Sequence, residues 1–68
     1  MASKTFRVPA ISCQHCVRTI TRELGAVPGV QEVRADVTTK EVVVVYEGDG
    51  VLERVRSTLR EIGYPPAE

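Results

Sequence analysis

The sequence lacks an excess of charge of either sign. Nine lysine and arginine residues balance nine aspartate and glutamate residues, so the formal net charge is +0 at pH 7. Proteins that bind nucleic acid through its phosphates usually carry a basic surplus, and acidic interaction tails show a block of like charges. The chain has neither feature, so its charge predicts no nucleic-acid partner.

Long hydrophobic segments are also missing. Residues Met1–Phe6 carry no apolar run, whereas a secretory signal needs an apolar stretch of about 7–15 residues. The longest apolar run, Val42–Tyr46, is strand-sized and falls far short of the ~18 residues that a membrane helix requires. We therefore expect no insertion into a membrane and a cytoplasmic location, where reducing conditions keep thiols free.

The chain is short, at 68 residues. A domain of this size buries only about 60% of the surface that its unfolded chain exposes, so it can form one thin core. We expect a single domain over residues 1–68. A deep catalytic cleft needs a larger scaffold, so we expect a binding protein rather than an enzyme.

Hydrophobic periodicity predicts five elements in the order βαββα. Strands are expected where apolar and polar residues alternate or where valines run together, and helices where apolar residues recur every three or four positions. The expected strands are Lys4–Val8, Val30–Val37 and Glu41–Tyr46, and the expected helices are Gln14–Gly25 and Val51–Ile62.

Turn and capping residues separate these elements. Thr38–Lys40 predicts a hairpin turn between two strands, and Gly63 is expected to stop the second helix. Asp49 is expected to cap the start of that helix, because an aspartate side chain can accept a hydrogen bond from a free backbone N–H of the first turn.

The end of the chain does not favour another strand. Pro65 and Pro66 exclude regular pairing through residues 64–68. A fourth strand is therefore expected to be absent or reduced to a stub. Because two amphipathic helices can cover one face of an antiparallel sheet, the pattern predicts an α+β sandwich of two layers.

Cysteines are scarce, and the two present are three residues apart. Cys13 and Cys16 fall where a loop enters the first expected helix. A helix N-terminus offers free N–H groups and partial positive charge, which favour thiolate, the form that binds metal. Arg18 is expected to add to this effect. Copper(I) is a soft ion that prefers thiolates, and two can suffice for it. The pair therefore predicts a copper(I) site.

Other interpretations of the pair remain open. A structural zinc site usually needs four protein ligands, and two cysteines with the single histidine are too few. A dithiol–disulfide couple is compatible with the spacing, although a thioredoxin-like motif is expected beside a parallel βαβ unit. Two inert thiols are the least specific interpretation. A plain interaction module, using an exposed edge strand, would need neither cysteine.

Three segments resemble the heavy-metal-associated domain family. Ala10–Val17 is similar to its metal-binding loop, Pro28–Val30 to its turn into the second strand, and Ile62–Tyr64 to its loop after the second helix. The resemblance is strongest to the small bacterial cytoplasmic copper chaperones. It implies a ferredoxin-like βαββαβ fold and one copper(I) ion as the only cofactor, passed to the metal-binding domain of a copper-transporting P-type ATPase by thiolate exchange.

The resemblance also assigns expected roles to single residues. Cys13 and Cys16 would be the copper ligands, and Tyr64 would pack near them and shield the site. His15 would be an exposed spectator, or an auxiliary ligand when two chains share several copper ions. Arg18 and Arg22 would form either a solvated helix face or a docking surface for an acidic partner.

One position departs from the family pattern, and the residues near the cysteines bear on the choice of metal. Ile11 stands where the family usually has methionine, and it is expected to fill the same buried space. No carboxylate neighbours the cysteines, as it does in zinc-selective relatives, so copper is expected rather than zinc or mercury.

Further partners and states follow from the same resemblance. A copper-responsive regulator is a second expected partner. The chain is expected to be a monomer without copper, and a copper-induced dimer is a further state that the resemblance allows. The alternative functions are a detached metal-binding domain of a copper ATPase and a small thiol oxidoreductase.

Overall fold

The computed structural model describes residues 2–67, which form five elements. They are β1 (Ala2–Arg7), α1 (Gln14–Gly25), β2 (Val30–Asp36), β3 (Glu41–Tyr46) and α2 (Val51–Glu61). The predicted order βαββα is confirmed.

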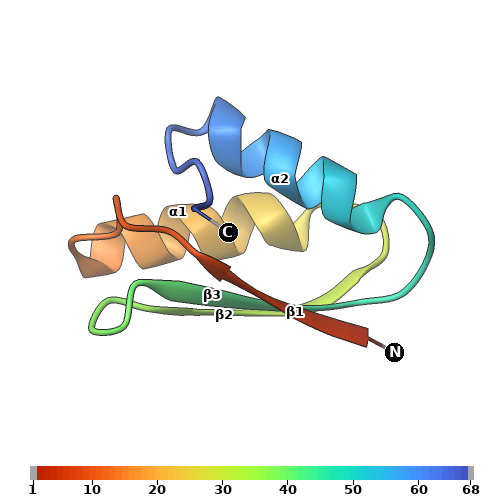
Figure 1. Cartoon of the computed structure of the whole chain (residues 1–68), viewed down its shortest axis with the longest axis horizontal. Coiled ribbons are helices and arrows are strands. Elements are labelled where there is room, and N and C mark those ends of the chain that lie inside the picture. The colour runs from red at the N-terminus through yellow and green to blue at the C-terminus, as the bar shows by residue number, and fades with distance from the viewer. Residues whose placement is uncertain (1, 68) are drawn as a thin grey trace.

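The three strands form one antiparallel sheet in the order β1-β3-β2. Figure 1 shows α1 and α2 on the same face of this sheet, which confirms the predicted two-layer α+β sandwich. The arrangement is that of a ferredoxin-like fold without its last strand. Within residues 2–67 no fourth strand follows α2. The tail reaches β1 through one backbone hydrogen bond of 2.6 Å, from Ala67 N–H to the Arg7 carbonyl.

The core lies between the sheet and the two helices. Strand β3 runs through the middle of the sheet and turns Val42 and Val44 toward the helices, where both are fully buried. Phe6 of β1 pairs with Val42 and is fully buried beside it. The valine run, which was expected to form a strand, is therefore the central strand of the sheet.

Helix α1 contributes Cys16, Ile20 and Leu24 to this core. These residues are four apart and share one helical face. Val17, the residue after Cys16, is only partly buried. The face that α1 buries therefore begins with a cysteine, and one member of the CxxC pair belongs to the core.

Helix α2 begins differently from its prediction. Gly50, with a φ of 78°, occupies the N-cap, and no side chain caps the helix. The prediction that Asp49 caps α2 is wrong, because the chain needs the left-handed conformation immediately before the helix and glycine adopts it without steric penalty. None of the helices within residues 2–67 has the length and hydrophobicity to cross a membrane.

The strand boundaries shift by a few residues from their predictions. Strand β1 begins at Ala2, because its pairing follows β3 as far as Tyr46, and it ends before Val8. Strand β2 ends at Asp36, whose carboxylate accepts hydrogen bonds from the backbone N–H groups of Thr38 and Thr39 at 2.7 and 3.2 Å. These bonds turn the chain before Val37 could extend the strand.

Candidate metal site

The two cysteines lie together at the start of α1. Cys13 is the N-cap residue of the helix and Cys16 lies in its first turn. Their Sγ atoms are 3.7 Å apart, and both thiols are free. The carbonyl of Cys13 accepts the N–H groups of Cys16 and Val17 at 3.1 and 3.4 Å. The predicted loop-to-helix position of the pair is thus the observed one.

The two thiols differ in their surroundings. Cys13 is exposed, whereas only 7% of Cys16 is accessible. This difference follows from the helix, because Cys16 is on the buried face with Ile20 and Cys13 precedes the first turn. One sulfur is therefore fixed in the core and the other is open to an incoming molecule.

Tyr64 lies beside Cys16 and changes its acidity. A side-chain hydrogen bond from Tyr64, and after it a backbone hydrogen bond from Ser12, lower the pKa of Cys16 to about 6, although burial opposes the shift. The same hydrogen bond raises the pKa of Tyr64. Cys16 is therefore held as a thiolate near neutral pH, in the form that binds metal.

The groups responsible for this shift differ from those expected. Arg18 was expected to help stabilise thiolate, but it is exposed and is not among the groups that shift the pKa of Cys16. Tyr64, expected to pack near the site and shield it, makes the largest contribution. The Ser12 hydroxyl is a further neighbour, 3.9 Å from the Cys16 sulfur.

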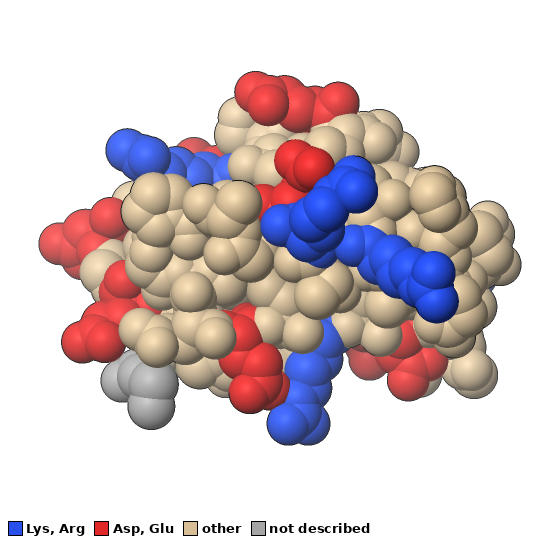
Figure 2. Space-filling view, turned by 180° about the vertical axis from the view of Figure 1, so that it is seen from behind, with Lys and Arg blue, Asp and Glu red and all other residues tan. Residues whose placement is uncertain are grey.

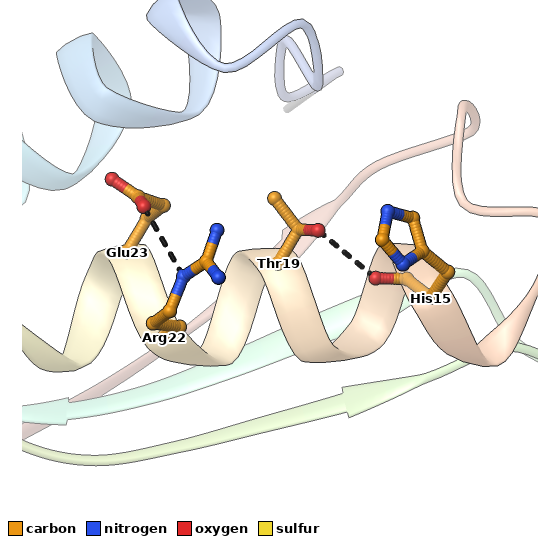
Figure 3. A network of polar contacts seen from close by, with 4 residues as sticks. All are labelled: His15, Thr19, Arg22 and Glu23. Atoms are coloured by element: carbon orange, nitrogen blue, oxygen red, sulfur yellow. Dashed lines mark hydrogen bonds and ion pairs between the residues drawn. The ribbon is translucent and has the colours of Figure 1, made fainter.

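His15 is not brought to the two sulfurs. Figure 3 shows its imidazole on the side of α1 that faces away from the strands, in a row with Thr19 and Glu23. Its backbone carbonyl accepts the Thr19 hydroxyl at 3.0 Å, which is an ordinary contact within a helix. Within residues 2–67, no three side chains of cysteine, histidine, aspartate or glutamate form a group that could hold a metal.

The two arginines of α1 are exposed, and one of them has an acidic neighbour on the helix. Arg22 lies 3.4 Å from the Glu23 carboxylate through its Nε atom (Figure 3). Arg18 is one turn closer to the cysteines and remains exposed. Figure 2 shows basic and acidic side chains interspersed over the face of the molecule opposite to that in Figure 1, with no continuous surface of one sign.

The segment before the cysteines is anchored by Ile11. Its side chain is fully buried, which is the position expected for it. Its carbonyl accepts the ammonium of Lys40 at 2.5 Å, from the turn between β2 and β3. Sequence reasoning missed Lys40, because the two residues are 29 positions apart and only the folded sheet brings them together.

Replacing Tyr64 by phenylalanine is expected to raise the pKa of Cys16 from about 6 toward 9.0, because the hydrogen bond that favours the thiolate is lost. The measurement is the rate of alkylation of Cys16 by iodoacetamide as a function of pH, followed by mass spectrometry of its peptide. In the unaltered protein the rate should be half-maximal near pH 6. In Tyr64→Phe the midpoint should move to higher pH.

The same shift predicts how stability depends on pH. Because the pKa of Cys16 is lower in the folded chain, this contribution to the free energy of unfolding grows as the pH rises from about 6 to 9.0 and is lost as the pH falls through about 6. Urea denaturation should show this dependence weakened in Tyr64→Phe. Tyr46→Phe, on β3, is the matched control, and an equal effect of both variants would contradict the role of Tyr64.

Comparison with known proteins places this site in a family. The heavy-metal-associated domain family matches residues 5–65. The COP-associated protein of Helicobacter pylori is 36% identical over 59 residues, which are 87% of this chain and 89% of that protein. The copper chaperone CopZ of Bacillus subtilis is 30% identical over 69 residues, which cover both chains completely. A copper-transporting ATPase of Helicobacter felis is 36% identical over 67 residues, but these are only 9% of its length.

Solved structures agree with the fold. The solution structure of apo-CopP from Helicobacter pylori superposes with a TM-score of 0.86 at 30% identity, covering 97% of this chain and all of that one. The N-terminal domain of ZntA in its Zn(II) form superposes with a TM-score of 0.87 at 25% identity, covering 96% and 88%. Since one relative is named as a copper chaperone and this ZntA domain is in its Zn(II) form, the fold alone does not select the ion.

Two relatives of about the same length are named as copper chaperones and not as enzymes, and the matches cover 100% and 87% of this chain. The larger relatives are copper-transporting ATPases, of which a short segment matches this chain. The protein with its CxxC pair at the start of α1 resembles a copper chaperone, and it is a member of the heavy-metal-associated domain family.

Proposed function

We propose that this protein binds one copper(I) ion between Cys13 and Cys16 and carries it in the cytosol to a copper-transporting P-type ATPase. The observation that carries this proposal is the pair of free thiols 3.7 Å apart, one exposed and one buried. The names of its full-length relatives support copper as the cargo.

The donor set favours copper(I) over zinc. Thiolates are soft ligands and suit copper(I), whereas structural zinc sites usually take four protein ligands. Within the described part of the chain no third cysteine, histidine or carboxylate joins the pair. Tyr64, partly buried against the core, covers the side of Cys16 and would shield a bound ion from water.

The exposed sulfur requires only a small adjustment to bind the ion. With metal–sulfur bonds of about 2.3 Å, the length known for zinc thiolates, a linear site would hold the sulfurs about 4.6 Å apart. The observed separation is 3.7 Å. Because Cys16 is fixed in the core and Cys13 is exposed, the adjustment falls on the side chain of Cys13.

Transfer would begin at that exposed side. A thiolate of the acceptor domain forms a bond to copper while both chaperone sulfurs still hold it. The bond from copper to Cys13 then breaks, and the released thiolate can take up the proton that the acceptor thiol gave up. A second acceptor thiolate displaces Cys16 in the same way. No electron moves, so copper remains copper(I) throughout.

Docking of the acceptor is proposed to involve α1. Arg18 is exposed close to the cysteines, whereas Arg22 already has Glu23 beside it. An acidic patch on an acceptor domain could therefore be attracted chiefly by Arg18, which would raise the rate of association more than the affinity. A copper-responsive regulator would dock at the same end of the molecule, beside the cysteines. A copper-bridged dimer, with His15 as an auxiliary ligand, would also form at this end.

The experiment is a competition of the reduced protein with a copper(I) chelator, with zinc as the comparison metal. Tight binding of one copper(I) ion and much weaker binding of zinc are expected. The loaded protein should then give its copper to a purified metal-binding domain of a copper ATPase. If Cys13→Ser binds copper(I) as tightly as the unaltered protein, the proposal is wrong.

The lowered pKa of Cys16, to about 6, gives one other function a physical basis. A reactive thiolate beside a second thiol could act as a thiol oxidoreductase. Turnover of a disulfide substrate by the metal-free protein would favour that function over copper transport. A metal-binding domain detached from a copper ATPase would bind copper in the same way. It would differ from a chaperone because it receives copper at the pump and does not carry it there.

A further inference from the structure

The turn between β2 and β3 lies beside the segment that leads into the cysteines. Figure 1 shows both at the same end of the sheet, on the left of the view. Lys40, the last residue of this turn, makes two contacts to the segment. Its carbonyl accepts the N–H of Val8 at 2.8 Å, and its ammonium donates to the carbonyl of Ile11 at 2.5 Å.

These two contacts are connected by a third hydrogen bond within the segment. The N–H of Ile11 donates to the carbonyl of Val8 at 3.1 Å, so both residues are joined to each other and to Lys40. The side chains of Val8 and Ile11 are fully buried. Ile11 is therefore held by its side chain in the core, by its N–H and by its carbonyl, two residues before Cys13.

Lys40 maintains these contacts in an unfavourable backbone conformation. Its φ is 58°, and it is the only residue other than glycine with a positive φ among residues 2–67. The turn is stabilised from its other end by Asp36, whose carbonyl accepts the N–H of Lys40 at 2.9 Å. Glycine would adopt this conformation without strain, but glycine has no ammonium to reach Ile11.

We propose that Lys40 is a positioning residue for the metal-binding loop, and that its ammonium orders the backbone at Ile11 so that Cys13 is presented to copper beside Cys16. The inference deepens the proposed copper-binding function and rests on it. A loop that is ordered before the ion arrives loses less conformational freedom on binding, and this increases affinity. The exposed cysteine is the one that needs such support, because Cys16 is already fixed by the core.

Three substitutions of Lys40 distinguish the effect of its ammonium from the effect of its backbone conformation. Lys40→Met removes the charge and the donor but keeps a long apolar stem. Lys40→Arg keeps a charged donor and the same backbone preference. Lys40→Gly removes the donor and relieves the strain at the positive φ. Lys4→Met, on β1, is the control with the same loss of charge.

The copper(I) affinity of each variant is measured by chelator competition. Changes to groups that support metal ligands typically weaken metal binding about 10–100-fold, so we expect at least about a tenfold loss in Lys40→Met and in Lys40→Gly. Lys40→Arg should restore most of the affinity. Lys40→Gly should melt at the same temperature as the unaltered protein or higher, which a purely structural role of the lysine would not allow.

A second measurement needs no metal. The NMR order parameters of residues 10–13 in the reduced, metal-free protein should fall in Lys40→Met and recover in Lys40→Arg. Unchanged order and unchanged copper affinity in Lys40→Met would overturn the inference, and so would an equal loss of affinity in Lys4→Met. Failure of the unaltered protein to bind copper(I) would instead overturn the proposed function, and the order parameters would still test the role of Lys40.

Discussion

Replacing Cys16 by serine is expected to weaken copper(I) binding by more than about a hundredfold, since even changes to groups that only support the ligands cost about 10–100-fold. The substitution removes the thiol whose pKa is held at about 6 and leaves Cys13 as the single sulfur ligand. A serine oxygen is a hard donor and a poor ligand for a soft ion. Competition with a copper(I) chelator under reducing conditions measures the effect.

The control for this substitution is Gln14→Ala. Gln14 lies between the two cysteines and is exposed, so it tests whether any change in this stretch has the same effect. Its copper(I) affinity should stay close to that of the unaltered protein. The circular dichroism spectrum of Cys16→Ser must also show a folded chain, because Cys16 is part of the core. A folded Cys16→Ser protein with unchanged affinity would contradict the assignment of Cys16 as a ligand.

The helices could be predicted from the sequence with little error. Their apolar residues recur every three or four positions, and this local pattern depends on no distant contact. Helix α1 has the predicted bounds, Gln14–Gly25, and α2 ends one residue early, at Glu61. The capping prediction for Asp49 failed because the conformation of Gly50 depends on how the chain leaves β3.

Strand ends were less predictable, because they depend on a partner strand. Ala2 and Ser3 show no strand pattern by themselves, yet they pair with Tyr46 and Val45. As predicted, no fourth strand forms within residues 2–67, since proline restricts the backbone locally. The single hydrogen bond from Ala67 to Arg7 could not have been predicted, because it joins the two ends of the chain.

The features of the metal site also divide into local ones, which the sequence predicts, and contacts between distant residues, which it does not. The cysteine spacing and its place at a helix N-terminus are local features, and they predicted the pair correctly. The difference between the two thiols depends on which face of α1 is buried. The contacts of Tyr64 with Cys16 and of Lys40 with Ile11 join residues far apart in sequence, at the end of the fold where three connecting segments meet. Only the three-dimensional arrangement reveals them.

The substitution Gly29→Ala is expected to have the largest effect on stability. Gly29 has a φ of 95°, a conformation that costs other residues about 1–2 kcal/mol. A Cβ atom there would lie 2.6 Å from the Val51 Cγ2 atom and 2.7 Å from the Glu47 carbonyl oxygen. The backbone cannot shift freely, because the Gly29 carbonyl accepts the N–H of Glu47 at 2.8 Å.

Strain and overlap together should lower the free energy of unfolding by about 3 kcal/mol or more. A domain of this size is stable by only about 3–10 kcal/mol, so Gly29→Ala should remove a large share of the stability of the metal-free protein. Gly25→Ala is the matched control, because its Cβ would meet nothing within 4 Å at the end of α1. Alanine also favours a helix over glycine by up to about 1 kcal/mol, so this variant should be as stable as the unaltered protein or more so. Urea denaturation followed by circular dichroism measures both variants, and equal midpoints would show that the turn at Gly29 tolerates a side chain.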